Sequence, residues 1–404
     1  MLKKPRILVV GSFMMDLIAS AERAPNAGET VIGKKFTTAP GGKGVNQAVQ
    51  CARLGAHVTM AGRVGDDAFG RIMTDAARAA GVDVSHVSVD PAESSGVGHI
   101  LLEVTEHGAQ NRITVCPGAN YTMKVEDIAW LREEIGCYDM LMMQFELPME
   151  VIETAAEWAR DAGVPVMVNP APAAPISPKL LSCATYLSPN EHEAALIAGH
   201  PIRTDAQGVC REDVAAVAAA FRKKGVEHLI ITLGENGSVA AGAEGIHETP
   251  CVRMPHVADP TAAGDSFVAA FCTGVCAGLP QGEALAFASH TAAITVTRIG
   301  AIPSLRTALT PSSSTTCNRH KGVNAMKPES RQAVAHFLIA AGRELNAFLE
   351  GLEADDYKAA VQMIRESRRG GGRVHVTGIG KPGHVAGYMA SLLSSTGTPA
   401  YFLH

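Results

Sequence analysis

The sequence predicts an α/β fold in which a mostly parallel sheet is covered by helices on both faces, giving three layers. Three observations lead to this prediction. Strand-like apolar runs alternate with helical patterns over the first 300 residues, which is typical of parallel sheets. The runs are apolar along their length, as in strands buried on both faces. Several helical patterns end at glycine, a frequent residue at helix C-termini.

The expected elements of this sheet follow in chain order. The first buried strand is expected at 6–11, because its apolar run is too short for a signal peptide and Asp16 interrupts the residues that follow. Further strands are expected at 57–65, 139–144, 164–169 and 228–234. The amphipathic patterns between them predict helices at 45–55, 149–163 and 211–225.

Two segments, 16–39 and 96–115, break the alternation. Each contains extended patterns in which polar and apolar residues alternate, with no helix between them. One interpretation is a small separate sheet that closes over a site as a lid. The other is an antiparallel extension of the main sheet, and the sequence favours neither.

Composition excludes several classes of function. The net charge of −5 argues against nucleic-acid and anionic-membrane partners, and no apolar window is long enough to cross a membrane. The nine cysteines are scattered without metal-binding spacing. Reduced thiols in a cytoplasmic protein are therefore expected.

The length of 404 residues indicates two or three domains. The α/β alternation ends near residue 306, and 307–329 is rich in Ser, Thr and Pro, as linkers are. We therefore expect domains at 1–306 and 330–404. The second begins with helical patterns at 331–352 and 355–370, and a strand is expected at 373–378.

The segment Asp259-Pro-Thr-Ala-Ala-Gly-Asp265 is followed at once by an apolar helical pattern. The start of a helix leaves backbone N–H groups unpaired and carries partial positive charge, so it can bind phosphate. A carboxylate beside it can accept the proton of a hydroxyl that attacks phosphorus. The segment indicates phosphoryl transfer to a small alcohol, and an ordinary capping turn fits it equally well.

A second glycine-rich element, GGKGVNQA (41–48), also opens a helical pattern. Glycine allows the backbone to approach a ligand closely, and Lys43 and Asn46 can donate hydrogen bonds to hydroxyl groups. The P-loop pattern GxxxxGK[ST] occurs nowhere in the chain. Phosphoryl transfer here would therefore proceed without a P-loop.

With several other motifs, these two elements make residues 1–306 resemble the ribokinase family of carbohydrate kinases, the PfkB-type sugar kinases. The motifs are Gly11-Ser12 with Asp16, GGKGVNQA, VGDDAFG (64–70), PGAN (117–120), NPAP (169–172), SPNEHEA (188–194), TLGENG (232–237), DPTAAGD (259–265) and VTRIGAIPS (296–304). Their order and spacing are more specific than any single pattern. The resemblance implies a three-layer α/β/α sandwich with a small β-sheet lid, and dependence on ATP, Mg²⁺ and a monovalent cation, usually K⁺.

The resemblance also implies roles for individual residues. Asp265 would be the catalytic base, and the N–H groups of Ala262, Ala263 and Gly264 would form the anion hole for the phosphoryl group. The expected sugar-binding residues are Asp16, Gly42, Lys43, Asn46, Glu146 and Asp265. The expected ATP-binding residues are Asn190, Thr232, Leu233, Gly234, Glu235, Asn236, Gly237, Gly264 and His290. Glu193 would lie in the Mg²⁺ region, and the monovalent-cation residues would be Asp259, Thr261, Thr295, Arg298, Gly300 and Ser304.

The expected reaction is transfer of the γ-phosphoryl group of ATP to the terminal hydroxyl of a pentose, with ribose as the leading candidate. Typical ribokinases carry Asn two residues before the first Asp, whereas this chain has Met14 before Asp16. Deoxyribose, a nucleoside or a hexose therefore remain alternatives, as does a non-catalytic sugar-phosphate sensor. Family precedent suggests a homodimer formed through the lid.

Residues 330–404 resemble the sugar isomerase (SIS) domain of arabinose-5-phosphate isomerases, through VTGIGKPGHVAGYMASLLSSTGTPAYFLH (376–404). Gly378–Gly383 also fits the dinucleotide pattern GxGxxG, but the acidic residue expected after the next strand is missing. Pro382 replaces the Ser that the family has in this turn. We expect an incomplete SIS-like domain without isomerase activity.

Overall fold

The computed structural model describes residues 3–105, 108–205, 208–242, 245–254, 256–305, 374–377 and 400–403. The chain divides into two compact units, Met1–Phe337 and Leu338–His404. The expected linker at 307–329, the helices at 331–352 and 355–370 and the glycine-rich turn at 378–383 lie outside the described residues. In the second unit, β16 (Val374–Thr377) and β17 (Ala400–Leu403) pair in parallel.

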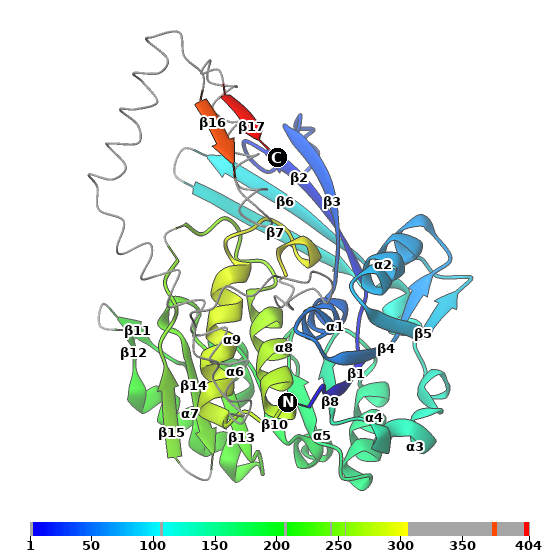
Figure 1. Ribbon diagram of the computed structural model, residues 1–404, viewed down its shortest axis with the longest axis vertical. Helices are drawn as coiled ribbons and strands as arrows, with labels where there is room; N and C mark the ends of the chain where they lie inside the picture. Colours follow the sequence, from blue (N-terminus) through cyan, green and yellow to red (C-terminus); the bar gives the residue numbers. More distant parts are fainter. Residues whose placement is uncertain are drawn as a thin grey trace. The chain divides into compact units, whose positions relative to one another are not determined.

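A large mixed sheet forms the centre of the first unit (Figure 1). Its strands are β1 (Arg6–Val10), β4 (His57–Gly65), β5 (Val82–Asp90), β8 (Met140–Gln144), β9 (Val166–Asn169), β10 (Tyr186–Leu187), β13 (His228–Thr232), β14 (Ser238–Gly242) and β15 (Gly245–Thr249). Their order is β15-β14-β13-β10-β9-β8-β1-β4-β5. Every pair from β13 to β5 is parallel, whereas β14 pairs antiparallel with both β13 and β15.

Helices cover both faces of this sheet. They are α1 (Lys43–Arg53), α2 (Ala68–Ala79), α3 (Leu131–Glu134), α4 (Met149–Asp161), α5 (Pro178–Cys183), α6 (Glu191–Ala198), α7 (Arg211–Lys223), α8 (Ala263–Cys276) and α9 (Gln281–Thr295). One layer contains α1, α8 and α9, with α8 packed against the other two (Figure 1). Alternate residues of β8 reach opposite layers: the sulfur of Met142 lies 3.8 Å from that of Cys51 on α1, whereas Leu141 packs in the core with Ile152 of α4.

The strands and helices expected from sequence are present in this unit, and their ends differ by a few residues. The strand expected at 228–234 ends at Thr232, because 234–236 form a 3₁₀ turn. The antiparallel strands β14 and β15 were not expected. Among the described residues, no helix has the length and hydropathy needed to span a membrane.

The two extended segments form a second, separate sheet. Its strands are β2 (Met14–Ala21), β3 (Lys35–Gly41), β6 (Val97–Thr105) and β7 (Gly108–Cys116), in the order β3-β2-β6-β7. The structure thus favours the separate small sheet over an extension of the main one, because no strand of this sheet pairs with β5 or β15. Residues 22–34 within the first segment form no strand.

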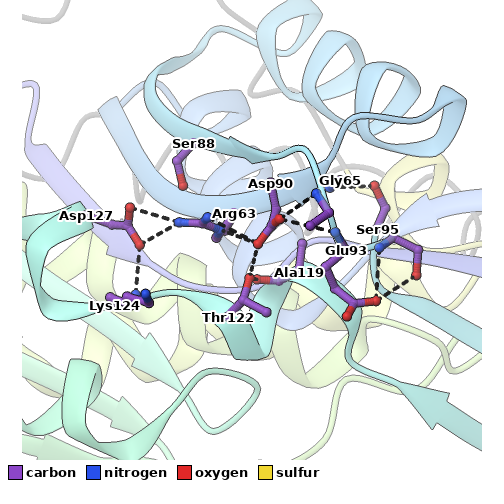
Figure 2. A network of polar contacts seen from close by, with 12 residues as sticks. Arg63, Gly65, Ser88, Asp90, Glu93, Ser95, Ala119, Thr122, Lys124 and Asp127 are labelled. Atoms are coloured by element: carbon purple, nitrogen blue, oxygen red, sulfur yellow. Dashed lines mark hydrogen bonds and ion pairs between the residues drawn. The ribbon is translucent and has the colours of Figure 1, made fainter.

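A polar network joins the large sheet to the segments that precede and follow the β6–β7 hairpin (Figure 2). Arg63 on β4 donates from Nε to Asp90 Oδ2 at 3.1 Å and from Nη1 to both carboxylate oxygens of Asp127, at 3.0 and 2.9 Å. Asp90, the last residue of β5, also accepts from the Thr122 hydroxyl at 2.6 Å. Because β6 and β7 lie between Asp90 and Thr122 in the chain, the network holds both ends of the β6–β7 hairpin at the large sheet.

Candidate functional site

A pocket of about 140 Å³ lies where the turn before α8 meets the N-terminal end of α1. It is lined by Lys43, Asn169, Ala171, Ser188, Asn190, Glu193, Thr232, Pro260, Ala262, Ala263, Gly264, Asp265 and Val268. Asn169 and Thr232 end β9 and β13, and Ser188 follows β10. The pocket is therefore beyond the carboxyl ends of parallel strands, where α/β sheets commonly bind ligands.

Asp265, in the first turn of α8, is buried in this site with 8% of its surface exposed. Its Oδ2 accepts a hydrogen bond from Asn46 Nδ2 at 2.9 Å, and its Oδ1 accepts one from Gln47 Nε2 at 3.1 Å. Burial raises the pKa of the Asp265 carboxyl, while the charge of Lys43 and the two amide hydrogen bonds act in the opposite direction. A buried carboxylate held in this way can act as a proton acceptor.

The turn before Asp265 has a strained backbone. Ala262 has a φ of 61°, in the left-handed region that costs a non-glycine residue about 1–2 kcal/mol. The N–H of Ala263 donates to the carbonyl of Pro260 at 3.2 Å. In the described part of the chain, the N–H groups of Ala262 and Gly264 donate to no protein atom. Two of the three expected anion-hole donors are thus available, and the third is used within the turn.

Asp16, on β2 of the small sheet, is close enough to Asp265 for the two carboxyl groups to interact electrostatically. Burial, followed by the charges of Glu146, Asp259 and Asp265, raises its pKa from 3.8 to about 6. A Cβ atom on Gly98 would lie 2.6 Å from Asp16 Oδ1, so a larger residue at that neighbouring position would displace the carboxylate. The small sheet therefore contributes a carboxyl group to the site.

Only one of the two polar atoms of the Asn46 side-chain amide has a hydrogen-bond partner in the described residues. Its nitrogen is bonded to Asp265, but its Oδ1 is buried and, in the described residues, accepts no hydrogen bond. Ser188 Oγ in the pocket is likewise without a partner. Buried polar atoms normally have partners, so these two atoms are suited to receive a ligand.

The Glu146 carboxylate lies at the start of α1, beside the backbone of Lys43. The Glu146 carboxylate accepts from the Ser12 hydroxyl and, at 3.1 Å, from the backbone N–H of Lys43. Burial raises the pKa of Glu146. Burial lowers the pKa of Lys43, but the charges of Asp265, Glu146 and Glu193 outweigh it, so that this pKa is raised. Gly42, with a φ of 111°, brings α1 against β2: a Cβ there would lie 2.7 Å from Met14 N.

Asn190 and Glu193 form the capping box of α6. The Asn190 side chain accepts from the Glu193 N–H, and the Glu193 carboxylate accepts from the Asn190 N–H, both at 2.8 Å. Both residues line the pocket. Burial raises the pKa of Glu193, and Lys43 opposes this rise. The capping box explains how the two residues are positioned. It uses one carboxylate oxygen of Glu193, and the other makes no bond to Asn190.

Of the expected ATP-binding residues from Thr232, which ends β13, to Gly237, Thr232 lines the pocket. Leu233 is buried, Gly237 is partly buried, and Gly234, Glu235 and Asn236 are exposed. The loop is closed by a hydrogen bond from the Leu233 N–H to the Gly237 carbonyl at 2.8 Å. His290 lies on α9, where its Nδ1 is 2.8 Å from the carbonyl of Ala286 in the same helix, and it is not among the pocket residues.

The residues expected to bind a monovalent cation lie on two segments that hydrogen bonds join. Asp259 accepts from the Thr261 and Gly300 N–H groups at 2.9 and 2.8 Å. The Thr295 hydroxyl lies 2.8 Å from that of Ser266. Two further members differ in exposure: the Ser304 hydroxyl is buried and donates to the Ala301 carbonyl at 2.8 Å, whereas Arg298 is exposed.

Three buried amides at the site were missed in the sequence analysis. Gln47 Nε2 contacts both Asp265 and Asn169, and Gln144 Nε2 contacts Gln47. Gln47 and Asn169 belong to the motifs GGKGVNQA and NPAP. These motifs were the signal in the sequence that could have pointed to Gln47 and Asn169. The two residues are 122 positions apart, however, and the sequence does not reveal that their side chains are in contact.

The site can be compared with known proteins. The model of the pfkB family carbohydrate kinases matches residues 4–308. Ribokinase of Schizosaccharomyces pombe is 39% identical over 309 residues, which cover 74% of this chain and 95% of that protein. Deoxyribokinase of Salmonella typhi is 32% identical over 266 residues, which cover 66% of this chain and 84% of that protein.

The fold agrees with this relationship. The structure of Arabidopsis thaliana ribokinase complexed with ribose and ATP is similar with a TM-score of 0.68 and 31% identity, covering 75% of this chain and 96% of that one. The matched region contains the large sheet, the small sheet and the pocket. This chain belongs to the pfkB family of carbohydrate kinases.

Proposed function

We propose that this chain transfers the γ-phosphoryl group of ATP to the terminal hydroxyl of a pentose, with ribose as the leading acceptor. The observation that carries the proposal is the position of Asp265. Its buried carboxylate is held by two amides and directly follows the turn at the start of α8 in which the N–H groups of Ala262 and Gly264 are free. The ribokinases of S. pombe and A. thaliana support the choice of ribose.

In the proposed reaction, Asp265 accepts the proton of the sugar hydroxyl as its oxygen bonds to the γ-phosphorus. The bond between that phosphorus and the bridging β–γ oxygen breaks, and ADP leaves with the electron pair. The Ala262 and Gly264 N–H groups stabilise the charge on the transferred group. Asp16, Gly42, Lys43, Asn46 and Glu146 are the proposed sugar-binding residues, and the unpaired Asn46 Oδ1 would accept from a sugar hydroxyl.

We propose that ATP is bound by Asn190, Thr232–Gly237, Gly264 and His290. To contact ATP through Nδ1, His290 would first have to break its hydrogen bond with the carbonyl of Ala286. Oxygen ligands suit Mg²⁺, which usually keeps several waters. The free carboxylate oxygen of Glu193 at the pocket fits such a role. When bound, Mg²⁺ neutralises phosphate charge. We propose that K⁺ binds near Asp259, Thr261, Thr295, Arg298, Gly300 and Ser304, mainly through backbone carbonyls.

A second acceptor, 2-deoxyribose, is favoured by Met14. This residue is 4% exposed and sits two positions before Asp16 on β2. A thioether is only a weak hydrogen-bond acceptor, so a sugar that lacks one hydroxyl loses less in its vicinity. The 32% identity to a deoxyribokinase agrees with this candidate.

A panel of acceptors with ATP tests the proposed function. Ribose, 2-deoxyribose, a hexose and a nucleoside are each incubated with the full chain, ATP, Mg²⁺ and K⁺, and ADP is measured. We expect turnover with a pentose and its loss, by about a thousandfold or more, in Asp265→Asn. Turnover with the nucleoside or hexose alone would contradict the pentose assignment. Sugar-phosphate binding without turnover of any acceptor would instead indicate a sensor.

We further propose the division into a kinase domain at 1–306, a linker at 307–329 and an SIS-like phosphosugar-binding segment at 330–404. The parallel pairing of β16 with β17 is compatible with this. No interconversion of pentose 5-phosphates by the full chain is expected. Measurable isomerase turnover that survives in Asp265→Asn would contradict this assignment.

The last proposal is a homodimer through the lid in a cytoplasmic enzyme. Exposed apolar side chains on the small sheet support it: Phe36 on β3 and Ile113 and Val115 on β7 are all more than half exposed. Light scattering after size-exclusion chromatography should show a dimer, and a monomer in Phe36→Glu. A monomeric wild-type chain would exclude this proposal.

A further inference from the structure

Buried amide side chains form a continuous series of hydrogen bonds that ends on Asp265. Gln47 Nε2 donates to Asp265 Oδ1 and to Asn169 Oδ1, each at 3.1 Å. Gln144 Nε2 donates to Gln47 Oε1 at 2.6 Å. Asn169 Nδ2 donates to the backbone carbonyl of Ser188 at 2.7 Å. Gln47 and Gln144 have no exposed surface, so water does not compete for these bonds.

The partners of each amide determine the direction in which it points. A backbone carbonyl can only accept, so Asn169 turns its nitrogen to Ser188 and its oxygen to Gln47. Gln47 must then present its nitrogen, which also reaches Asp265. Its oxygen is left to face Gln144, which presents its nitrogen in turn. The series therefore points a donor at the carboxylate, and a donor stabilises the ionised form.

We infer that Gln47 is a positioning residue that keeps Asp265 Oδ1 engaged and the carboxylate ready to accept a proton, and that Gln144 and Asn169 hold Gln47 in this direction. The inference rests on the proposed role of Asp265 as base. Each carboxylate oxygen accepts one amide hydrogen bond, Oδ1 from Gln47 and Oδ2 from Asn46, so the acceptor hydroxyl meets a lone pair that neither amide uses. The four residues come from α1, β8, β9 and α8, so the series also connects the base to the central sheet.

Other charged groups face Asp265, and they do not make this donor redundant. Lys43 on α1 favours the ionised carboxylate. Asp16 on β2, Glu146 after β8 and Glu193 on α6 are acids whose pKa values respond to Asp265, and repulsion from them opposes ionisation. Gln47 supports the carboxylate without adding a charge to a site that must receive phosphate groups.

Gln47→Met tests the inference, because methionine matches the length of glutamine and lacks the donor. Loss of a hydrogen bond to a charged group predicts a fall in kcat of about tenfold to a hundredfold at pH 7. The KM values for sugar and ATP should change by less than about threefold, and the acid limb of the kcat profile should move to higher pH. Sugar affinity measured calorimetrically without ATP should be retained, which a general loss of structure would not allow.

Gln50→Met is the matched control. Gln50 lies one turn further along α1, is equally buried, and accepts from the Ser266 hydroxyl rather than contacting Asp265. We expect this variant to lower the Tm about as much as Gln47→Met and to leave the position of the acid limb unchanged. A shift of the acid limb in Gln50→Met, or none in Gln47→Met, would overturn the inference.

Gln144→Glu and Gln144→Met test the direction of the series. A carboxylate at 144 attracts the Gln47 nitrogen and draws it away from Asp265, so kcat should fall as far as in Gln47→Met. Methionine at 144 only removes a support, so its effect should be smaller. Unchanged kcat and pH profile in Gln144→Glu would contradict the inference. The proposed function fails separately, if the wild-type chain transfers phosphate to no sugar or Asp265→Asn keeps full activity.

Discussion

The carboxylate of Asp259 accepts a hydrogen bond at 2.8 Å from the backbone N–H of Gly300, 41 residues further along the chain. The same carboxylate accepts from the Thr261 N–H. Asp259 thus joins the turn that leads to Asp265 with the segment that follows α9. This contact places the two parts of the proposed cation site beside the helix start that would bind phosphate.

Asp259→Ala should separate these two segments and weaken activation by K⁺. We expect the K⁺ concentration for half-maximal activity to rise about tenfold or more, because two N–H groups lose a charged acceptor. The measurement is the initial rate as a function of K⁺ at constant ionic strength, maintained with tetramethylammonium. Equal wild-type activity in K⁺ and in tetramethylammonium would show that no such site contributes to catalysis.

Asp16→Asn should stabilise the protein above pH 6. The folded-state pKa of Asp16 is raised from 3.8 to about 6, so the folded state binds the proton more tightly than the unfolded state does. Stability from this group is present below pH 4 and is lost as the pH rises through about 6. The variant should therefore gain about 1–3 kcal/mol in free energy of unfolding at pH 7.5, measured by urea denaturation.

The comparison of variant and wild type at pH 4 serves as the control. Asp16 of the wild type is then protonated, so the difference in stability should vanish. Sugar affinity should be lower in the variant than in wild type at pH 7.5 if the ionised Asp16 accepts sugar hydroxyls as proposed, and this difference should shrink at pH 4. Wild-type affinity for sugar should likewise decrease as the pH falls through about 6. A variant that is less stable than wild type at pH 7.5 would contradict the cost of ionising Asp16 in the folded state.

Arg63→Met should weaken the attachment of the segments that flank the β6–β7 hairpin to the large sheet. The change leaves the carboxylates of Asp90 and Asp127 facing each other without the guanidinium that separates them. Removal of one partner from such a sheltered cluster predicts a Tm lower by ~5 °C or more in differential scanning calorimetry. Arg71→Met removes an exposed pair with Asp66 and should change the Tm by no more than about 1 °C. Similar shifts in both variants would argue against the anchoring role.

Gly44→Ala should displace α1 from the first strands. A Cβ atom at this position would lie 2.3 Å from the backbone nitrogen of Ser12, a contact that forces the helix away. We expect a loss of about 2 kcal/mol or more in the free energy of unfolding, together with reduced kcat, because α1 carries Asn46 and Gln47. Gly282→Ala, where the added Cβ meets nothing within 4 Å, should be tolerated. Full stability of Gly44→Ala would mean that the close approach is not required.

The central sheet was predictable because its signal is local. An apolar run such as 57–65 is buried on both faces in any parallel sheet, and β4 occupies those residues. The edge strands β14 and β15 were missed, since the exposed residues of β15 break the apolar pattern. The extended segments 16–39 and 96–115 were recognised, but their pairing in a separate sheet depends on contacts between distant residues.

The sequence by itself determined the family, the parallel sheet and the two glycine-rich helix starts, because each is encoded by neighbouring residues. Only the tertiary structure decided what surrounds Asp265: the amides of Asn46 and Gln47, 219 and 218 residues away, which hold its two oxygens. The physical reason is that hydrogen-bond direction and burial depend on packing in three dimensions. Residue type indicates which groups can donate a hydrogen bond, and the fold determines to which atom they donate.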